Sequence, residues 1–130
     1  MSETVRGVVV GHGDMPQGLV DAVRHISGGA ADGLVAISNE GKSPDQLAEE
    51  LNAAAGSDPV IVFADLRAGS CGIAAAYTCR DRDRRAFICG VNLPMLLDFV
   101  FHRDEPLPQL VDRLVEKGRD AIAAAPSPKA

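Results

Sequence analysis

The sequence predicts an α/β domain with a doubly wound, mainly parallel four-stranded sheet and helices on both faces. Short apolar runs alternate along the chain with amphipathic helical stretches, which is typical of strand–helix–strand units. The strand runs are almost continuously apolar, as expected for a sheet that is covered on both faces. With 130 residues, the chain has room for one domain with its own core, and we expect residues 1–130 to form that single domain.

Four short apolar runs, bounded by Gly, Pro, Asn or Asp, are the predicted strands. They cover Val5–Val10, Leu34–Ile37, Val60–Ala64 and Ala86–Val91. Sites in such sheets form at the carboxyl ends of the strands, near the point where the strand order reverses. The residues of greatest interest therefore follow the strands directly: Gly11–Gly13, Ser38–Asn39, Asp65–Ser70 and Asn92.

Five helices are predicted between and after these strands. They cover Met15–Ser27, a stretch from Pro44 to the break at Gly56, Ser70–Thr78, Asn92–Phe101 and Leu107–Ala124. Asp14 with Gln17 resembles a capping box, as does Ser43 with Gln46, and Asn92 is a candidate N-cap. We expect the tail, residues 126–130, to be frayed.

Composition and charge exclude several classes of protein. The formal net charge of −5 argues against nucleic acid as the main partner, because phosphate backbones favour basic surfaces. Cys71, Cys79 and Cys89 form no CxxC pair, zinc pattern or disulfide framework. With no apparent signal peptide, and with Val8–Val10 far too short to span a membrane, we expect a cytoplasmic, reducing location.

His12 is the strongest candidate for chemistry. It follows the first strand between Gly11 and Gly13, which allow a tight turn and an accessible ring, and the next helix starts close by with N–H groups that favour an anion. Asp65 ends the third strand, which neighbours the first in the usual strand order. A carboxylate on one ring nitrogen would fix the tautomer and leave the other nitrogen as nucleophile. The alternative is a turn histidine and a loop aspartate without a chemical role.

The loop after the third strand carries further candidates. Ser70 follows Gly69, and its hydroxyl and the nearby backbone N–H groups could hold phosphate oxygens, or Ser70 could be a simple N-cap. Arg67 could add positive charge or meet an acidic partner, although a solvated arginine is the plainer reading. Cys71, near a helix N-terminus, is either a reactive thiol or a small apolar core residue.

Three segments resemble the mannose-family IIA components of the bacterial sugar phosphotransferase system. Gly11–Leu19 resembles the first motif of that family, Gly90–Leu96 its second signature, and Asp65–Ser70 its aspartate followed by a Gly-Gly-Ser-Pro-like loop. The resemblance covers the chain from Arg6 to about Gly118. Two positions depart from it: Ala68 replaces the first loop glycine, and Cys71 replaces the proline after the serine.

The resemblance implies a function for the candidate residues. His12 would accept phosphate from the phosphocarrier protein HPr and donate it to a histidine of an EIIB protein, on a separate chain, for sugar uptake with the membrane components EIIC and EIID. Asp65 would orient His12, while Ser70, Gly69 and Gly13 would hold the phosphate. Met15, Pro16 and Arg67 are candidate docking residues. No metal or cofactor is required, because a protein supplies the phosphate.

The resemblance also implies a homodimer in which a C-terminal strand is exchanged. The strand would be Gly118–Ala125, although its alanines also suit the end of a helix, and both readings stay open. Two other functions remain open as well: a regulatory phospho-acceptor without a transporter, and a small-ligand binding module on the same fold. The Asn92–Met95 signature points away from the related subunit that feeds dihydroxyacetone kinase. The sequence does not identify the sugar.

Overall fold

Four parallel strands form the middle layer of the molecule. The computed structural model describes residues 3–67, 69–79 and 84–126, without the side chains of Ser70 and Tyr77. In this part of the chain the strands are β1 (Arg6–Gly11), β2 (Leu34–Ser38), β3 (Val60–Ala64) and β4 (Arg85–Cys89), in the order β2-β1-β3-β4. All three neighbouring pairs are parallel. The prediction of a doubly wound parallel sheet is confirmed.

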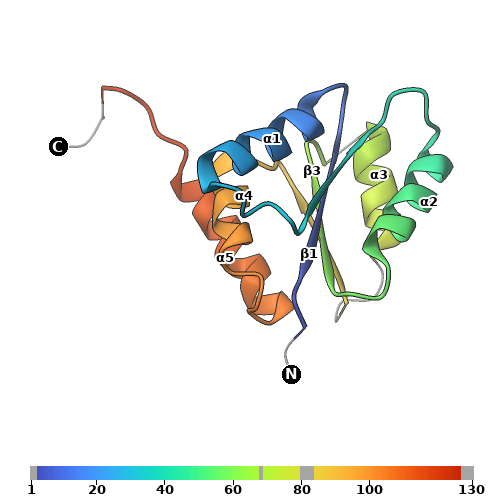
Figure 1. Ribbon diagram of the computed structural model, residues 1–130. Coiled ribbons are helices and arrows are strands. Elements are labelled where there is room, and N and C mark those ends of the chain that lie inside the picture. The colour runs from blue at the N-terminus through green and yellow to red at the C-terminus, as the bar shows by residue number, and fades with distance from the viewer. Residues whose placement is uncertain (1–2, 68, 80–83, 127–130) are drawn as a thin grey trace.

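Helices cover both faces of this sheet (Figure 1). On one face lie α2 (Pro44–Ala55) and α3 (Gly69–Thr78), and on the other lie α1 (Met15–Ser27), α4 (Leu93–Val100) and α5 (Leu107–Asp120). The order reverses at β1, since the chain goes from β1 to one edge strand and then returns to β3 on the other side. The switch point therefore lies between the carboxyl ends of β1 and β3, where such folds place their sites.

The two central strands are apolar except for Arg6 at the start of β1, because each contributes to two cores. Val9 of β1 belongs to the cluster under α1, α4 and α5, whereas Val8 and Val10 belong to the cluster under α2 and α3. Successive side chains of a strand point to opposite faces, and all three valines are completely buried. Phe63 of β3 meets Phe99 of α4 edge to face at 5.3 Å between ring centroids, which fixes α4 against the sheet.

The register of β1 and β3 makes the two strands end level with each other at one edge of the sheet. Val10 pairs with Ala64, the last residue of β3. The residues that follow, Gly11–His12 on one strand and Asp65 on the other, therefore emerge side by side. This register is set by the buried apolar faces, because a slip of one residue would turn each strand's core side chains to the wrong face.

Of the three predicted helix N-caps, Asp14 is wrong, and Ser43 and Asn92 are confirmed. Asp14 makes no side-chain cap, and its φ of −87° and ψ of 0° are not the extended conformation that an N-cap adopts. Gln17 donates instead to Asp21, one turn further along α1, at 2.9 Å. Ser43 forms the full capping box of α2 with Gln46.

The end of the fourth strand differs from the prediction. β4 ends at Cys89 rather than Val91, because Gly90 adopts a positive φ of 79° and turns the chain. The N–H groups of Gly90 and Val91 both donate to the carbonyl of Ala64, at 2.9 and 3.1 Å. The turn brings Asn92 to the start of α4, where its side chain accepts from the N–H of Met95 at 3.1 Å and caps the helix as predicted.

The last helix is shorter than the sequence predicts. α5 ends at Asp120, with Ala121 as its C-cap, rather than continuing to Ala124. The following residues, 121–126, are exposed, and they lead away from the body of the molecule (Figure 1). Within one chain they form neither helix nor strand, so the exchanged strand is not confirmed, and most of the tail predicted to fray lies outside the described residues. In the described part of the chain, no helix has the length and apolar character needed to cross a membrane.

Candidate functional site

His12 and Asp65 form a hydrogen-bonded pair at the carboxyl ends of β1 and β3. The ring Nδ1 of His12 lies 2.6 Å from Oδ2 of Asp65, and the backbone N–H of His12 donates to the same oxygen at 3.0 Å. The His12 side chain is 50% exposed, whereas that of Asp65 is 13% exposed. The carboxylate therefore holds both the backbone and the ring of His12, and the imidazole remains open to solvent. The structure thus brings together two residues that the sequence placed after neighbouring strands.

The environment of Asp65 favours its charged form. Burial by itself raises the pKa of Asp65, but the hydrogen bonds from the His12 ring and from the N–H groups of His12 and Leu66 outweigh it. The pKa of Asp65 therefore lies below its ordinary value, and the Leu66 N–H bond to Oδ1 measures 2.8 Å. An ionised carboxylate accepts a hydrogen bond from a proton on Nδ1. In the neutral imidazole that carries this proton, the ring lone pair is on Nε2.

Glycines on each side of His12 meet two different requirements. A Cβ on Gly11 would lie 3.1 Å from Oδ2 of Asp65 and 2.7 Å from Cε of Met15, so Gly11 makes room for the carboxylate. Gly13 has a positive φ of 59° and open space around it, so its role is the turn itself. The N–H of Gly13 lies 3.4 Å from Oδ1 of Asn39, which follows β2. Sequence analysis placed Asn39 after a strand end, near the site, but predicted no role for it.

The loop from Asp65 to α3 folds tightly back on the first turn of that helix. A Cβ on Gly72 would collide with the backbone carbonyls of Arg67 and Leu66, so only glycine permits this approach. Gly69 has a φ of 91°, and a Cβ there would lie 4.0 Å from Cε1 of His12, beside the ring. The result is that Cys71, completely buried, lies close to the pair: one ligand atom each of His12, Asp65 and Cys71 fall within 4.8 Å of one another.

The other predicted site residues are distributed unevenly around His12. Gly13 and Gly69 flank it, and Ser70 begins α3, although the Ser70 side chain lies outside the described atoms. Among the predicted docking residues, Arg67 is exposed and Met15 is half-buried. Pro16 is buried in the first turn of α1, so it offers little surface to a partner.

Two exposed apolar side chains, one directly after Asp65 and one on α3, were missed in the sequence. Leu66 is 57% exposed and follows Asp65 directly, and Ile73 is 60% exposed on α3. Ile73 had no clear sequence signal, because α3 is too rich in Ala and Gly to show one apolar face. Exposed apolar residues beside a reactive group are typical of a protein-docking surface.

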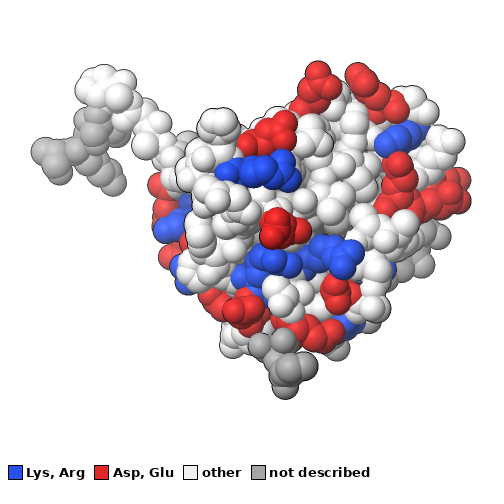
Figure 2. Space-filling model, in the orientation of Figure 1, with Lys and Arg blue, Asp and Glu red and all other residues white. Residues whose placement is uncertain are grey.

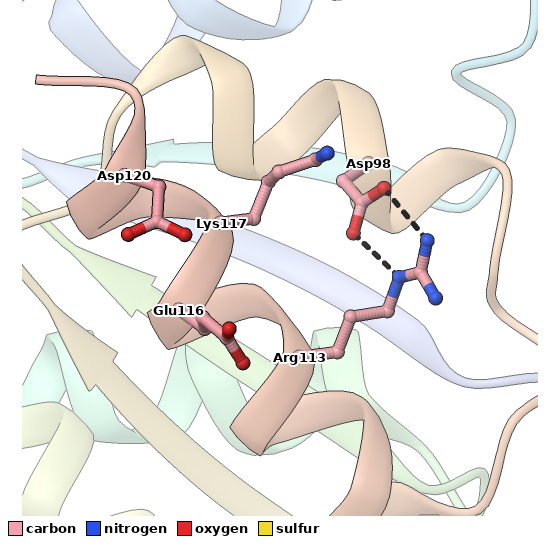
Figure 3. A pocket seen from close by; sticks show the side chains of 5 residues that line it. All are labelled: Asp98, Arg113, Glu116, Lys117 and Asp120. Atoms are coloured by element: carbon pink, nitrogen blue, oxygen red, sulfur yellow. Dashed lines mark hydrogen bonds and ion pairs between the residues drawn. The ribbon is translucent and has the colours of Figure 1, made fainter.

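A second His–Asp contact lies at the C-terminal end of α4. The Nδ1 of His102 lies 2.8 Å from the carbonyl oxygen of Asp98 and 3.4 Å from its Oδ1. The Asp98 carboxylate is held by Arg113, at 2.7 and 3.3 Å, in a shallow pocket lined also by Glu116, Lys117 and Asp120 (Figure 3). This charged surface cluster joins two helices and contains no activated nucleophile.

Positive and negative side chains are mixed on the face of the molecule that Figure 2 shows. On the face that Figure 2 shows, Lys and Arg side chains alternate with Asp and Glu side chains, and no continuous basic surface is visible. Several of these charges are paired, as Arg6 is with Asp58 at 2.7 Å and Lys42 with Glu50 at 2.7 Å.

Comparison with known proteins identifies the family. The model of the PTS system fructose IIA component family, of mannose type, matches residues 7–115. The chain belongs to this family. The match includes β1 with His12, the Asp65 loop, Asn92 and most of α5. Membership of the IIA family supports a role in phosphotransfer within the sugar phosphotransferase system.

Solved structures show the same IIA fold. The EIIA component from Streptococcus agalactiae is 22% identical with a TM-score of 0.85, over 92% of this chain and 96% of its own. The mannose/sorbose specific IIA subunit from Enterococcus faecalis is 23% identical with a TM-score of 0.83, over 98% of both chains. The IIA protein associated with the fucose utilization operon of Streptococcus pneumoniae is 17% identical with a TM-score of 0.79, over 95% and 94%. A comparison with curated proteins gave no match.

Proposed function

We propose that the protein is a phosphoryl carrier that accepts phosphate on Nε2 of His12 from phospho-HPr and passes it to a histidine of an EIIB protein. The observation that carries the proposal is the 2.6 Å contact between His12 Nδ1 and Asp65 Oδ2. With a proton on Nδ1 that points to the Asp65 carboxylate, Nε2 keeps the lone pair. Nε2 is therefore the proposed nucleophile, on a ring that is half exposed. Family membership supports the phosphotransfer chemistry.

The transfer needs little covalent machinery from the protein. The phosphorus–nitrogen bond to the donor histidine breaks as a new bond forms from phosphorus to Nε2 of His12, while the Nδ1 proton stays on the ring. The ring becomes more positive during this step, and the ionised Asp65 stabilises that charge. Positioning and charge stabilisation account for most of the catalysis in such transfers.

Backbone N–H groups are the proposed ligands of the phosphoryl oxygens. α1 begins three residues after His12 and has no side-chain cap, so its first turn can donate to an anion. Gly13 and Gly69 flank the ring, and Ser70 starts α3. We propose Gly13, Gly69 and Ser70 as the phosphate-binding residues. No metal or nucleotide takes part in this step, because the donor is a phosphoprotein.

The docking surface for HPr and EIIB surrounds His12 in this proposal. Arg67 and Met15 remain its predicted members, and the exposed Leu66 and Ile73 add apolar area. Charged side chains at the rim of such a surface steer the encounter, while apolar residues at its centre exclude water. EIIC and EIID would act downstream, in the membrane, and this protein would work in the cytoplasm.

A homodimer by strand exchange is also part of the proposal. β4 is an edge strand of the sheet, and the exposed tail after α5 carries Ile122 with 77% of its surface in solvent. An exposed edge strand and an exposed extended tail can satisfy each other between two copies. The expected mass in solution is twice the 13.6 kDa of the chain, and a single-chain mass by light scattering would rule the dimer out.

The deciding experiment is reconstituted phosphorylation. The protein is incubated with phosphoenolpyruvate, enzyme I and HPr, and its intact mass is recorded beside His12→Ala and the matched control His102→Ala. We expect one acid-labile phosphoryl group on the wild type and on His102→Ala, and none on His12→Ala. Phosphate on His12→Ala, or none on any variant with a cognate HPr, would overturn the proposal. A phosphorylated protein that no EIIB can discharge would instead support the regulatory function.

A further inference from the structure

The thiol of Cys71 lies beside the proposed phosphotransfer site. Cys71 lies in the first turn of α3, is completely buried, and takes no part in the proposed transfer. Its sulfur is nonetheless close to the two residues that carry the reaction, since one ligand atom each of His12, Asp65 and Cys71 lie within 4.8 Å of one another. No other group of three His, Cys, Asp or Glu side chains among the described residues converges in this way.

We propose that His12, Asp65 and Cys71 bind a thiophilic divalent cation of the Zn²⁺ class, and that the bound ion prevents phosphorylation of His12. Imidazole nitrogen, carboxylate oxygen and thiolate sulfur are the three ligand types that Zn²⁺ takes in proteins. The carboxylate and the thiolate together supply two negative charges, which balance the charge of the ion. A neutral imidazole completes a three-ligand set with an open fourth position for water.

The distances fit a site that closes on the ion. Zinc bonds of about 2.0–2.3 Å at tetrahedral angles place the ligand atoms about 3.4–3.6 Å apart. His12 Nδ1 and Asp65 Oδ2, now 2.6 Å apart, would separate by roughly 1 Å, and the sulfur would approach by a similar amount. The half-exposed His12 ring has the freedom to move, and it leaves the site open on one side while Cys71 is covered by the fold.

The backbone explains why the thiol is held there. Gly72 lets the carbonyls of Arg67 and Leu66 approach the first turn of α3 to a distance that any Cβ would prevent. This packing joins the Asp65 loop to the residue before Gly72, which is Cys71. The ligands thus come from two strand ends and one helix start, all tied to the buried sheet, so side-chain adjustments within a fixed backbone would complete the site.

Either mode of imidazole coordination removes the nucleophile. If the ion takes Nε2, it occupies the atom that attacks phosphorus. If the ion takes Nδ1, the ring proton moves to Nε2, whose lone pair is then no longer available. In both cases Cys71 binds as the thiolate and its proton goes to solvent, and a phosphoryl group already on the ring would keep the ion out. Binding itself does not depend on the proposed function, whereas its consequence for phosphorylation does.

The test measures Zn²⁺ binding without any phosphotransfer component. Purified metal-free protein is titrated with Zn²⁺ against a chromophoric chelator, and Co²⁺ is used as a spectroscopic probe of thiolate ligation. We expect Cys71→Ser and His12→Ala each to lose about 10- to 100-fold in Zn²⁺ affinity, and Cys71→Ser to lose the Co²⁺–thiolate absorption band. Cys89→Ser, which changes an exposed thiol outside the site, is the matched control and should bind as the wild type does. Circular dichroism confirms that each variant is folded.

A second experiment measures whether bound Zn²⁺ prevents the phosphorylation of His12. Phosphoryl incorporation by the wild type should fall as Zn²⁺ is added and return with chelator, while Cys71→Ser should keep its own metal-free rate at the same Zn²⁺ concentration. Equal Zn²⁺ affinity in wild type and Cys71→Ser would overturn the site. Tight binding with unchanged phosphorylation would overturn the competition and keep the site. Failure of phosphorylation in metal-free wild type would count against the proposed function alone.

Discussion

Two histidine–aspartate pairs in this molecule have the same side chains and different surroundings. His12 and Asp65 come from the ends of separate strands, and in the described part of the chain the Asp65 carboxylate bonds to His12 and to the N–H of Leu66. His102 and Asp98 are one helical turn apart, and the closer partner of the His102 ring is a backbone carbonyl. The Asp98 carboxylate is taken by Arg113 (Figure 3).

The difference shows what makes a histidine reactive. A carboxylate paired with a guanidinium has little negative charge left to stabilise an imidazolium, so Asp98 stabilises the packing of α4 on α5. A carboxylate that accepts only N–H groups keeps its charge available to the ring, as Asp65 does. Position adds to this, because His12 lies at the switch point of the sheet, beside a helix start, and His102 follows the end of a helix.

The largest effect on the phosphorylation rate should come from removing the charge of Asp65, and removing the charge of Asp98 in a second variant is the comparison. Asp65→Asn should lower the rate of His12 phosphorylation by about 10²- to 10³-fold, because the amide no longer stabilises the charged ring or fixes its tautomer. Asp98→Asn should leave that rate within about twofold and cost about 1–2 kcal/mol of stability through the weakened Arg113 bond. The measurements are single-turnover transfer from phospho-HPr and urea unfolding.

Similar rates for Asp65→Asn and the wild type would show that Asp65 only places the backbone of His12. A large loss of rate in Asp98→Asn would instead reveal a link between the two pairs that their separate bonding does not explain.

A smaller effect is expected from two glycines on the same strand. Gly11→Ala would place a Cβ 3.1 Å from Oδ2 of Asp65, whereas Gly7→Ala would place one 2.7 Å from Leu34 and Phe99 in the core. We expect Gly11→Ala to reduce the phosphorylation rate by about tenfold by displacing the carboxylate. Gly7→Ala should cost about 1–3 kcal/mol of stability and keep the transfer rate of the folded protein. Equal rates in the two variants would contradict the steric role of Gly11.

The smallest effect concerns the pH dependence of stability. The pKa of Asp65 is lowered from the ordinary 3.8 in the folded protein, so its contribution to stability is present above that value and is lost as the pH falls through the folded pKa. Compared with Asp65→Asn, the wild type should lose stability as the pH is lowered from about 6 to about 2.5. Urea unfolding across this range measures the difference, and a difference that stays constant with pH would show that the Asp65 charge does not stabilise the fold.

The sequence predicted the fold well where one local signal decides the outcome. Val60–Ala64 is a strand and Met15–Ser27 a helix with the predicted bounds, because their apolar spacing permits no other buried arrangement. The Asp14 cap, the end of β4 and the end of α5 were wrong, because each depends on a backbone turn. Asp14 is not extended, Gly90 has a positive φ, and α5 stops after Asp120 although the alanines that follow favour helix.

The sequence by itself determined the sheet, its helices, and His12 and Asp65 as the residues proposed to react, since apolar periodicity and the residues after each strand carry that information. Only the tertiary structure decided which atoms meet. The β1–β3 register places Asp65 beside His12, Arg113 takes Asp98 away from His102, and the room left by Gly72 brings Cys71 to the pair. These contacts join residues far apart in the chain, and packing sets their distances to within an ångström, which no local pattern encodes.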